Sequence, residues 1–387
     1  MAKQLTSRQK IRSAFLWLHR WLGIVTGLVV FVVAVTGCLY VFEKEAREIF
    51  QYKYYHVAVS DSSKMNLGEL QKIVQQKFPG DAINSIRFLE KKDAAYIFNT
   101  RKNKAISVNP YTGGIIGVRN TKKDFFNVVL RLHRTLLLGH TGEQIIKWNV
   151  LVFFILCISG LILWWPKQKN FLKRAVTIKF KTKNRKRFNW DLHTVLGFYA
   201  LLLLLLISLT GMFWVFDSVK SIVRFTTQSP NKKEEKIKSR SAAGKGFPIE
   251  AAYRQAAVSH PGAREIVIIS PADSLAPIRI IMQYPYMLVR KQNNLFFDQY
   301  SGEILKENLY TNYSAYDKVS RSNYQLHTGD IPGLGIGIKI IYFLAGLFAA
   351  SLPITGFLIW WGRNKKKKKH ITTSVSSKSA VNATVIA

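Results

Sequence analysis

The sequence predicts an α-helical membrane protein in which four transmembrane helices form a tandem repeat and two small α+β domains lie outside the cytoplasm. Three observations predict this fold class. Four segments are nearly free of charge and long enough to cross a bilayer core, which takes about 20 residues of helix. All nine tryptophans lie at or near the ends of these segments, where interfacial anchors belong. The three most basic segments contain no acidic residue.

These features define the expected spans and their direction. Short cytoplasmic segments of membrane proteins are enriched in Lys and Arg. Residues 1–20, 166–190 and 362–387 are basic and free of acids, so both termini are expected in the cytoplasm. The long loops 43–147 and 217–337 are then expected outside it. The expected spans are Phe15–Phe42, Trp148–Trp165, His193–Phe216 and Ile338–Trp361.

Charge and cysteine content exclude several classes of protein. The net charge of +35 could indicate nucleic-acid binding, but there is no zinc-finger spacing and no RNA-type aromatic box. Cys38 and Cys157 both lie in apolar spans, which argues against a disulfide framework, an iron–sulfur cluster and a thiolate zinc site. No CxxCH motif is present, so covalently attached c-type haem is excluded. The expected surroundings are a lipid bilayer, with no nucleic-acid partner.

The two halves of the chain share their sequence pattern. The first span reads LHRWLG…TGCLYVFEKE and the third reads LHTVLG…TGMFWVFDSV, at a constant offset of 174. The second and fourth spans also match, since Leu132-His133 corresponds to Leu326-His327 and Ser159-Gly160 to Thr355-Gly356. Both halves run in the same direction, so any symmetry axis is expected along the membrane normal.

Each outer loop predicts one helix over a small antiparallel sheet. A helix is expected from Asn66 to Phe78, and another from Pro248 to about Ser259; each stops at a Pro-Gly pair. The expected strands are Ile83–Leu89, Ala95–Thr100 and Ala105–Val108 in the first copy, and Ile266–Ser270, Ile278–Gln283, Met287–Val289 and Leu295–Phe297 in the second. Residues 229–246 are expected to be a linker, and the tail after Lys369 is expected to be disordered.

The resulting division of the chain has nine parts. They are a cytoplasmic N-terminus (1–14), the first span (15–42), the first outer domain (43–124), an interfacial segment with the second span (125–165), a basic cytoplasmic loop (166–192), the third span (193–216), a linker with the second outer domain (217–326), an interfacial segment with the fourth span (327–361) and a basic cytoplasmic tail (362–387).

Four histidines at span ends are the candidate functional residues. His19 and His193 lie at the cytoplasmic ends of the first and third spans, and His133 and His327 precede the second and fourth on the outer side. The repeat therefore predicts one pair near each membrane face. In b-type cytochromes two imidazoles, usually from different helices, hold one haem iron, so two b haems are predicted. Zinc is less favoured because neither pair has a carboxylate or thiolate nearby. The alternative is that these histidines are ordinary interfacial residues.

Further residues bear on this site. Arg20 and Arg134 directly follow the first-half histidines and could pair with haem propionates, although Arg20 could equally be a cytoplasmic anchoring charge. His140 is a reserve ligand for the outer site. Small residues in the spans allow either close helix packing or room for a flat macrocycle, and the sequence leaves these open; they are Gly23, Gly27, Gly37, Gly160, Gly197, Gly211 and Gly356.

The outer domains resemble PepSY domains, and the spans resemble the PepSY-associated transmembrane helix family over about residues 10–363. The LHR and LHT motifs and the endings SGLILWW and TGFLIWW carry this resemblance. It implies a multi-pass protein of the bacterial inner membrane linked to iron uptake. The sequence is also similar to ferric-siderophore reductases that bind two b haems. This similarity implies that His19, His133, His193 and His327 are the haem ligands. No GxGxxG motif precedes a helix, so the electron donor is expected to be a separate cytosolic reductase or a quinol.

Three functions remain in competition. The first is a di-haem reductase of a ferric chelate or siderophore, for which no catalytic residue is assigned. The second is a non-redox module in which membrane-anchored PepSY domains bind a peptide, protease or chelate. The third is a transporter, which is disfavoured because the spans lack the mid-membrane charges that mark ion and substrate paths.

Overall fold

The computed structural model describes residues 6–166, 168–231, 236–240 and 246–383, with the backbone alone at 169 and 363–383. It divides into two compact units. The helical unit comprises Met1–Val41, Leu130–Phe216 and Ile336–Ala387, and the sheet unit comprises Phe42–Val129 and Asp217–Gly335. Each unit is described separately below.

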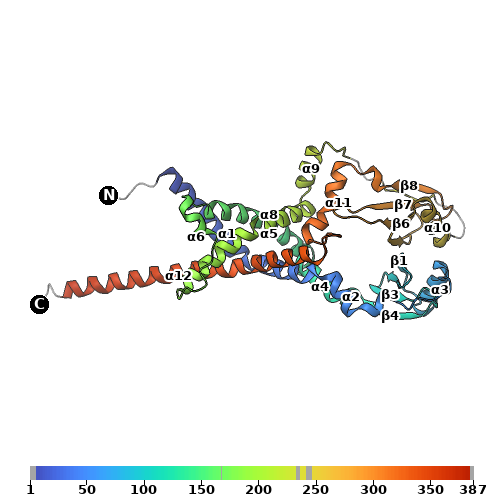
Figure 1. Cartoon of the computed structure of the whole chain (residues 1–387), viewed down its shortest axis with the longest axis horizontal. Coiled ribbons are helices and arrows are strands. Elements are labelled where there is room, and N and C mark those ends of the chain that lie inside the picture. The colour runs from blue at the N-terminus through green and yellow to red at the C-terminus, as the bar shows by residue number, and fades with distance from the viewer. Residues whose placement is uncertain (1–5, 167, 232–235, 241–245, 384–387) are drawn as a thin grey trace. The chain divides into compact units, whose positions relative to one another are not determined.

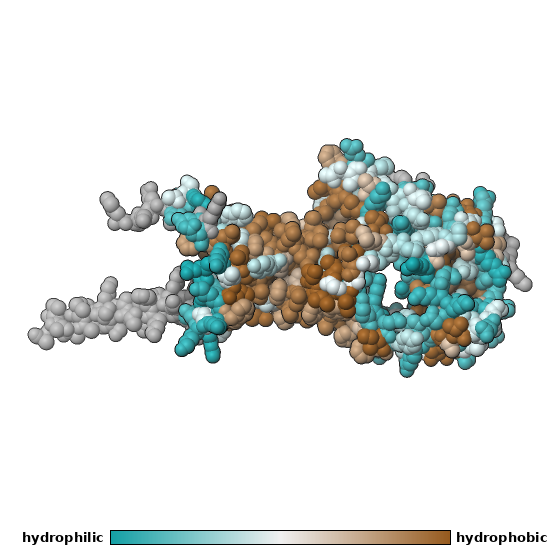
Figure 2. All heavy atoms as spheres, in the orientation of Figure 1, coloured by the Kyte–Doolittle hydropathy of each residue, from teal (hydrophilic) through white to brown (hydrophobic). Residues whose placement is uncertain are grey.

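Among the described residues, the helical unit contains four long apolar helices, one at each predicted span (Figure 1). The first three end within one residue of the prediction but begin eight or nine residues earlier than predicted. Each of the four is long and apolar enough to cross a membrane. Apolar side chains form a broad band around the middle of this unit on the face that Figure 2 shows. The helix α1 packs along α5, and α5 packs along α8. The helices are α1 (Ser7–Val41), α5 (Gly139–Trp164), the continuous α7 (Arg185–Asp191), π-helical turn (Leu192–Leu196) and α8 (Gly197–Val215), and α12 (Gly335–Ala383).

The fourth helix extends further than the sequence suggested. We expected the tail after Lys369 to be disordered, but α12 continues to Ala383. Neither glycine nor proline occurs between residues 363 and 383, so no residue there terminates the helix. The last four residues lie outside the described part of the chain.

The sheet unit contains one antiparallel sheet of eight strands rather than two separate small sheets. Strand β1 of the first predicted domain pairs with β5 of the second, from Ser85 opposite Ile269 to Leu89 opposite Glu265. The pairing protects an edge that each smaller sheet would expose. The strand order is β4-β3-β2-β1-β5-β6-β7-β8. The strands are β1 (Ile83–Leu89), β2 (Tyr96–Thr100), β3 (Lys104–Val108), β4 (Ile115–Asn120), β5 (Glu265–Ile269), β6 (Ile278–Gln283), β7 (Gln292–Phe297) and β8 (Ile304–Asn308).

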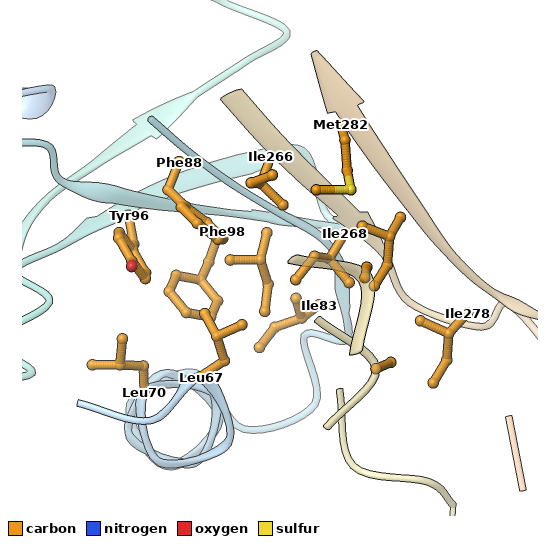
Figure 3. Packing of buried hydrophobic residues seen from close by; sticks show 14 of the residues in the cluster. Leu67, Leu70, Ile83, Phe88, Tyr96, Phe98, Ile266, Ile268, Ile278 and Met282 are labelled. Atoms are coloured by element: carbon orange, nitrogen blue, oxygen red, sulfur yellow. The ribbon is translucent and has the colours of Figure 1, made fainter. Parts of the chain in front are cut away.

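One core serves the whole sheet. The helices α3 (Leu67–Lys77) and α10 (Ile249–Ser259) contribute residues to a single cluster of buried side chains, shown in part in Figure 3. Alternate residues of each strand enter this core, for example Ile278, Ile280 and Met282 of β6. The intervening residues lie on the opposite face of the sheet. Burial of each large apolar side chain contributes about 1.5–3 kcal/mol, which stabilises the two halves as one unit.

Three strand predictions need correction. Strands β4 and β8 were not expected, and the expected strand Met287–Val289 is instead part of a loop. The last residue pair between β6 and β7 is Gln283 with Gln292. The chain between these two residues must therefore turn back, which makes it a loop. The predicted linker 229–246 is irregular where it is described; residues 232–235 and 241–245 lie outside the described residues.

Several shorter helices were not expected. They are α2 (Glu43–Phe50), α4 (Phe125–Thr135), α6 (Leu172–Ala175), α9 (Asp217–Thr226) and α11 (Ala315–Thr328). The helix α11 begins at a capping box between Ser314 and Asp317 and ends at Gly329, whose φ of 70° suits glycine. Because α11 contains few large apolar residues, its periodicity is weak in the sequence.

A buried ion pair connects α2 to the start of α4. The guanidinium of Arg47 donates to Asp124 at 2.9 and 2.5 Å, and both side chains are largely buried. Burial by itself would raise the pKa of Asp124, but the hydrogen bonds and charge of Arg47 outweigh it and hold that pKa below its ordinary value. The ionised carboxylate therefore stabilises this corner of the sheet unit.

Candidate functional site

His19 and His193 lie together in the helical unit. Their ring centroids are 6.4 Å apart and their planes are inclined by 85°. His19 belongs to α1, whereas His193 lies in the π-helical turn that precedes α8. A π-helical turn inserts one residue into the helical repeat and redirects the side chains around it, and such turns are frequent at functional sites.

A hydroxyl group holds each of these two imidazoles. The Nδ1 atom of His19 lies 2.9 Å from Oγ of Ser159 on α5. The Nδ1 atom of His193 lies 2.9 Å from Oγ1 of Thr355 on α12. The four long helices thus contribute in pairs, with the imidazole from one helix and the hydroxyl from the other.

The contacts of the two hydroxyls favour one tautomer of each imidazole. Thr355 donates to the carbonyl of Ser351 at 2.9 Å, and Ser159 donates to the carbonyl of Leu156 at 3.1 Å. A hydroxyl has a single proton, so an oxygen that already donates can only accept from the imidazole. With each hydroxyl proton directed to the carbonyl of its own helix, the neutral rings are assigned a proton on Nδ1. Nε2 keeps its lone pair, as a metal-ligating histidine requires.

His133 shows the same arrangement with a partner from α1. Its Nδ1 atom lies 3.0 Å from the carbonyl oxygen of Val33 and 3.1 Å from Oγ1 of Thr36. A carbonyl oxygen can only accept, so Nδ1 of His133 is the donor. Three of the four predicted ligands thus have Nδ1 occupied and Nε2 in the basic form.

Glycine follows each of these hydroxyl residues and makes room for the ring. A Cβ atom on Gly356 would lie 3.2 Å from Cε1 of His193, which is tighter than ordinary packing. On Gly160 it would lie 3.4 Å from Cε1 of His19, and on Gly37 it would lie 3.5 Å from Cε1 of His133. These three glycines allow an imidazole to lie against the neighbouring helix.

The pair His19 and His193 lines a cavity of about 410 Å³ within the helical unit. This volume falls in the usual range for cofactor pockets, roughly 300–1,000 Å³. The lining is mostly apolar and comes from α1, α5, α12 and the continuous helix of α7, the π-helical turn and α8. It includes Trp164, Trp190 and Trp360. Arg20 also lines the cavity, and its buried Nε atom has no hydrogen-bond partner among the described residues.

These residues fit a haem held by two imidazoles. A metal bound by one nitrogen of each ring at about 2.0–2.1 Å would place the ring centroids roughly 6 Å apart, close to the observed spacing. Within the described residues no group of three or more His, Cys, Asp or Glu side chains could hold a metal ion. Two imidazoles alone would leave the other coordination positions to a chelating macrocycle. The free Nε of Arg20 suits an acidic substituent on such a ring.

The remaining predicted residues lie elsewhere. His327 is on α11 in the sheet unit, so its pairing with His133 stays a prediction. Arg134 is exposed on α4. His140 lies at the start of α5 with 84% of its side chain exposed, and its Nδ1 is 3.8 Å from Oε2 of Glu143. His140 therefore lacks the hydroxyl partner and the burial that the other three histidines share.

The hydroxyl residues were missed by the sequence reasoning, although the sequence contains a signal for them. A Ser-Gly or Thr-Gly pair occurs once in the second half of each span. Three of these pairs meet an imidazole in the structure. They are Thr36-Gly37, Ser159-Gly160 and Thr355-Gly356, and the fourth is Thr210-Gly211.

Comparison with known families agrees with this architecture. The family described as the PepSY-associated TM region matches residues 16–363, which includes all four long apolar segments and the sheet unit. Among curated proteins, the comparison finds no match for this chain. Because the family matches most of the chain, the protein belongs to the PepSY-associated transmembrane family.

Proposed function

We propose that this protein is a di-haem, b-type electron-transfer protein that reduces a ferric chelate, such as a ferric siderophore, during iron uptake. In this proposal it lies in a bacterial inner membrane with both termini in the cytoplasm. The observation that carries the proposal is the pair His19 and His193: two imidazoles with basic Nε2 atoms and a 6.4 Å centroid spacing, lining an apolar cavity.

The residues of this cavity have distinct tasks. His19 and His193 would each offer one nitrogen to the haem iron, and the hydroxyls of Ser159 and Thr355 would hold the two rings in the ligating tautomer. Arg20 offers a guanidinium to an acidic substituent of the cofactor, and the apolar lining excludes water. A haem bound there would supply one-electron transfer. The protein would set the reduction potential of the haem through the ligands, their hydrogen bonds and burial.

A second haem, held by His133 and His327, rests on the tandem repeat of the sequence. The Nδ1 contacts of His133 support its part in this site, because they reproduce those of His19 and His193. Two cofactors are proposed because the bilayer core is about 30 Å thick, and the histidine pairs are expected near opposite faces. Electrons would enter from a separate reductase or quinol and leave to the chelate outside.

Reduction is a sufficient release mechanism for chelated iron. Hard oxygen ligands bind Fe³⁺ more tightly than Fe²⁺, so one electron loosens the complex without hydrolysis of the chelator. The proposed reaction takes one electron from the reduced protein and converts the ferric chelate into its ferrous form. The iron complex is the substrate here, and the electron comes from the reduced protein.

A specific observation favours a second candidate, a non-redox binding module anchored in the membrane. A groove of about 680 Å³ lies between α3 and α10 of the sheet unit. Its walls include both charged and polar side chains, among them Lys72, Glu250 and Arg254, which could hold a peptide or a chelate. This candidate predicts a colourless protein whose span histidines can be replaced without loss of function.

Anaerobic reoxidation tests the proposed function. Chemically reduced protein in detergent is mixed with ferric citrate or a ferric siderophore, and the haem spectrum is followed. We expect reoxidation that is faster than in buffer alone. The matched gallium complexes have nearly the same shape and charge but do not accept an electron, and they should leave the haem reduced. If several different ferric chelates also leave the spectrum unchanged, the reductase proposal is wrong even for a haem protein.

A further inference from the structure

The second half of the sheet unit contains a polar network on the face opposite the core. Arg279 of β6 donates from Nη2 to Oδ1 of Asn294 at 2.6 Å, and Nε2 of Gln292 donates to the same oxygen at 3.1 Å. Arg321 of α11, which lies beside β7, donates from Nη1 to Oε1 of Gln292 at 3.3 Å. Two guanidinium groups are thus connected through two amide side chains of β7.

A third arginine joins this network from the loop between β6 and β7. The backbone N–H of Arg290 donates to the carbonyl of Arg321 at 3.3 Å. The guanidinium of Arg290 lies 5.2 Å from the ring centroid of Tyr324, and that of Arg321 lies 5.5 Å from the ring of Tyr313. Stacking uses the face of a guanidinium and leaves the N–H donors in its plane available.

Arg290 and Arg321 of this network lack a carboxylate partner among the described residues. The buried Nε of Arg290 also has no acceptor among them. Asp317, four residues before Arg321 on α11, makes its hydrogen bonds to Ser314 and forms no ion pair with any guanidinium that the structure describes, and Glu307 pairs with His260. Adjacent half-buried cations repel one another, so the cluster is more stable with an anion bound.

The environment of Tyr313 agrees that two guanidiniums lie close together. Burial raises the pKa of this phenol, while Arg321 and Arg290 both act to lower it and Asp317 acts to raise it. The hydroxyl of Tyr313 donates to the carbonyl of Gln292 at 2.9 Å, which places the ring beside the amide network.

The other half of the sheet lacks this chemistry. Strands β3 and β7 correspond to one another because each is followed by a similar turn, Tyr111-Thr-Gly113 and Tyr300-Ser-Gly302. Arg279 pairs with Phe296 across β6 and β7, and the corresponding pair across β2 and β3 is Ile97 with Ser107. Ala105 occupies the position of Asn294. A sheet of the same form is therefore built without the arginine or the amide, so folding does not require them.

We propose that Arg279, Arg290 and Arg321, hereafter the arginine cluster, bind the oxygen-rich organic shell of a negatively charged chelate. Carboxylate and catecholate oxygens match planar guanidinium donors, and aromatic rings beside the cations accommodate catechol faces. The cluster thus selects anionic iron complexes over neutral ones. The role of the bound complex as a substrate rests on the proposed function. Anion binding by the arginine cluster is independent of that function.

Redox-inert complexes test this inference separately from electron transfer. The full-length protein in detergent is titrated calorimetrically with gallium citrate and a gallium tris-catecholate, which are anionic, and with an uncharged gallium tris-hydroxamate. We expect the two anionic complexes to bind, more weakly at higher salt, and the neutral complex not to bind. Combined Arg290→Gln and Arg321→Gln substitutions should weaken anion binding roughly tenfold or more. Arg101→Gln, which removes an exposed arginine that follows β2, should not.

The outcomes separate the two proposals. The double variant Arg290→Lys with Arg321→Lys keeps the charge but loses the planar donors, so it should bind the anionic gallium complexes less tightly than the wild type does. It also serves as a control for misfolding of the glutamine variant. The inference is overturned if neither anionic gallium complex binds, or if both double variants bind as tightly as Arg101→Gln. Gallium binding without reoxidation by the ferric complexes would instead contradict the proposed function and leave the arginine cluster as an anion site.

Discussion

Replacing Thr355 by valine is expected to weaken cofactor binding between His19 and His193. Valine has nearly the shape of threonine but no hydroxyl, so it removes the oxygen that lies 2.9 Å from Nδ1 of His193. The ring then loses the contact that holds its orientation and tautomer. The adjacent Gly356 is unchanged, and the space for the imidazole is therefore preserved.

The size of the effect follows from what remains around Nδ1. A buried donor left without any acceptor costs about 1–3 kcal/mol. In His193 the backbone of Leu352 is a second hydrogen-bond partner, so the cost should lie at the lower end, about 1 kcal/mol. Since about 1.4 kcal/mol corresponds to a factor of ten, haem affinity at this site should fall about fivefold. The loss of orientation should also shift the midpoint potential.

The assay is a haem titration of the apoprotein in detergent, followed by absorbance, together with a redox titration. The matched control is Thr26→Val on α1, whose hydroxyl donates only to its own helix, to Leu22 at 2.8 Å. Thr26→Val should bind haem as the wild type does. If Thr355→Val and Thr26→Val give the same affinity and the same midpoint potential, the hydroxyl does not position the ligand and the tautomer argument is wrong.

Three further predictions follow from the same account. Cysteines introduced at Lys102 and Lys183 should be labelled from opposite sides of the membrane; labelling of both from one side would refute the topology. His193→Ala should remove about half of the haem, whereas His140→Ala should remove none, and equal haem content in the two variants would exclude the proposed ligand. Because the pKa of Asp124 is lowered in the folded protein, its stabilisation is present above pH ~4 and is lost as pH falls below that value. Asp124→Asn should therefore destabilise the protein by about 3 kcal/mol at pH 7. The melting temperature of this variant should also fall less steeply than that of the wild type as the pH is lowered. An unchanged melting temperature at pH 7 would count against this ion pair.

The sequence contains strong signals for the spans and for the family. Long apolar segments, terminal tryptophans and acid-free basic segments are each caused by the bilayer, so they agree with one another, and the four long helices lie where they indicate. The expected family is confirmed by the match over residues 16–363. The pairing of His19 with His193 could be predicted only from the repeat, because the two residues are far apart in the chain. Equivalent residues of the two halves were expected to meet at the same end of the helical bundle.

Other features depend on contacts that leave little trace in the sequence. Serine and threonine in apolar helices commonly donate to a carbonyl of their own helix, as Thr26 does, so a hydroxyl alone does not reveal that it also accepts from an imidazole. The joining of two sheets through β1 and β5 requires strands about 180 positions apart to find one another, and nothing local specifies that pairing. The helix α11 is specified by its caps more than by its apolar periodicity.

The absorption spectrum of the purified full-length protein tests the central claim most directly. A reduced-minus-oxidised difference spectrum shows whether a b-type haem is present, and the haem content per chain counts the sites. The account predicts a red protein with a six-coordinate, bis-imidazole spectrum and two haems per chain, one of which is lost in His193→Ala. A colourless protein that takes up no haem when haem is supplied would contradict it.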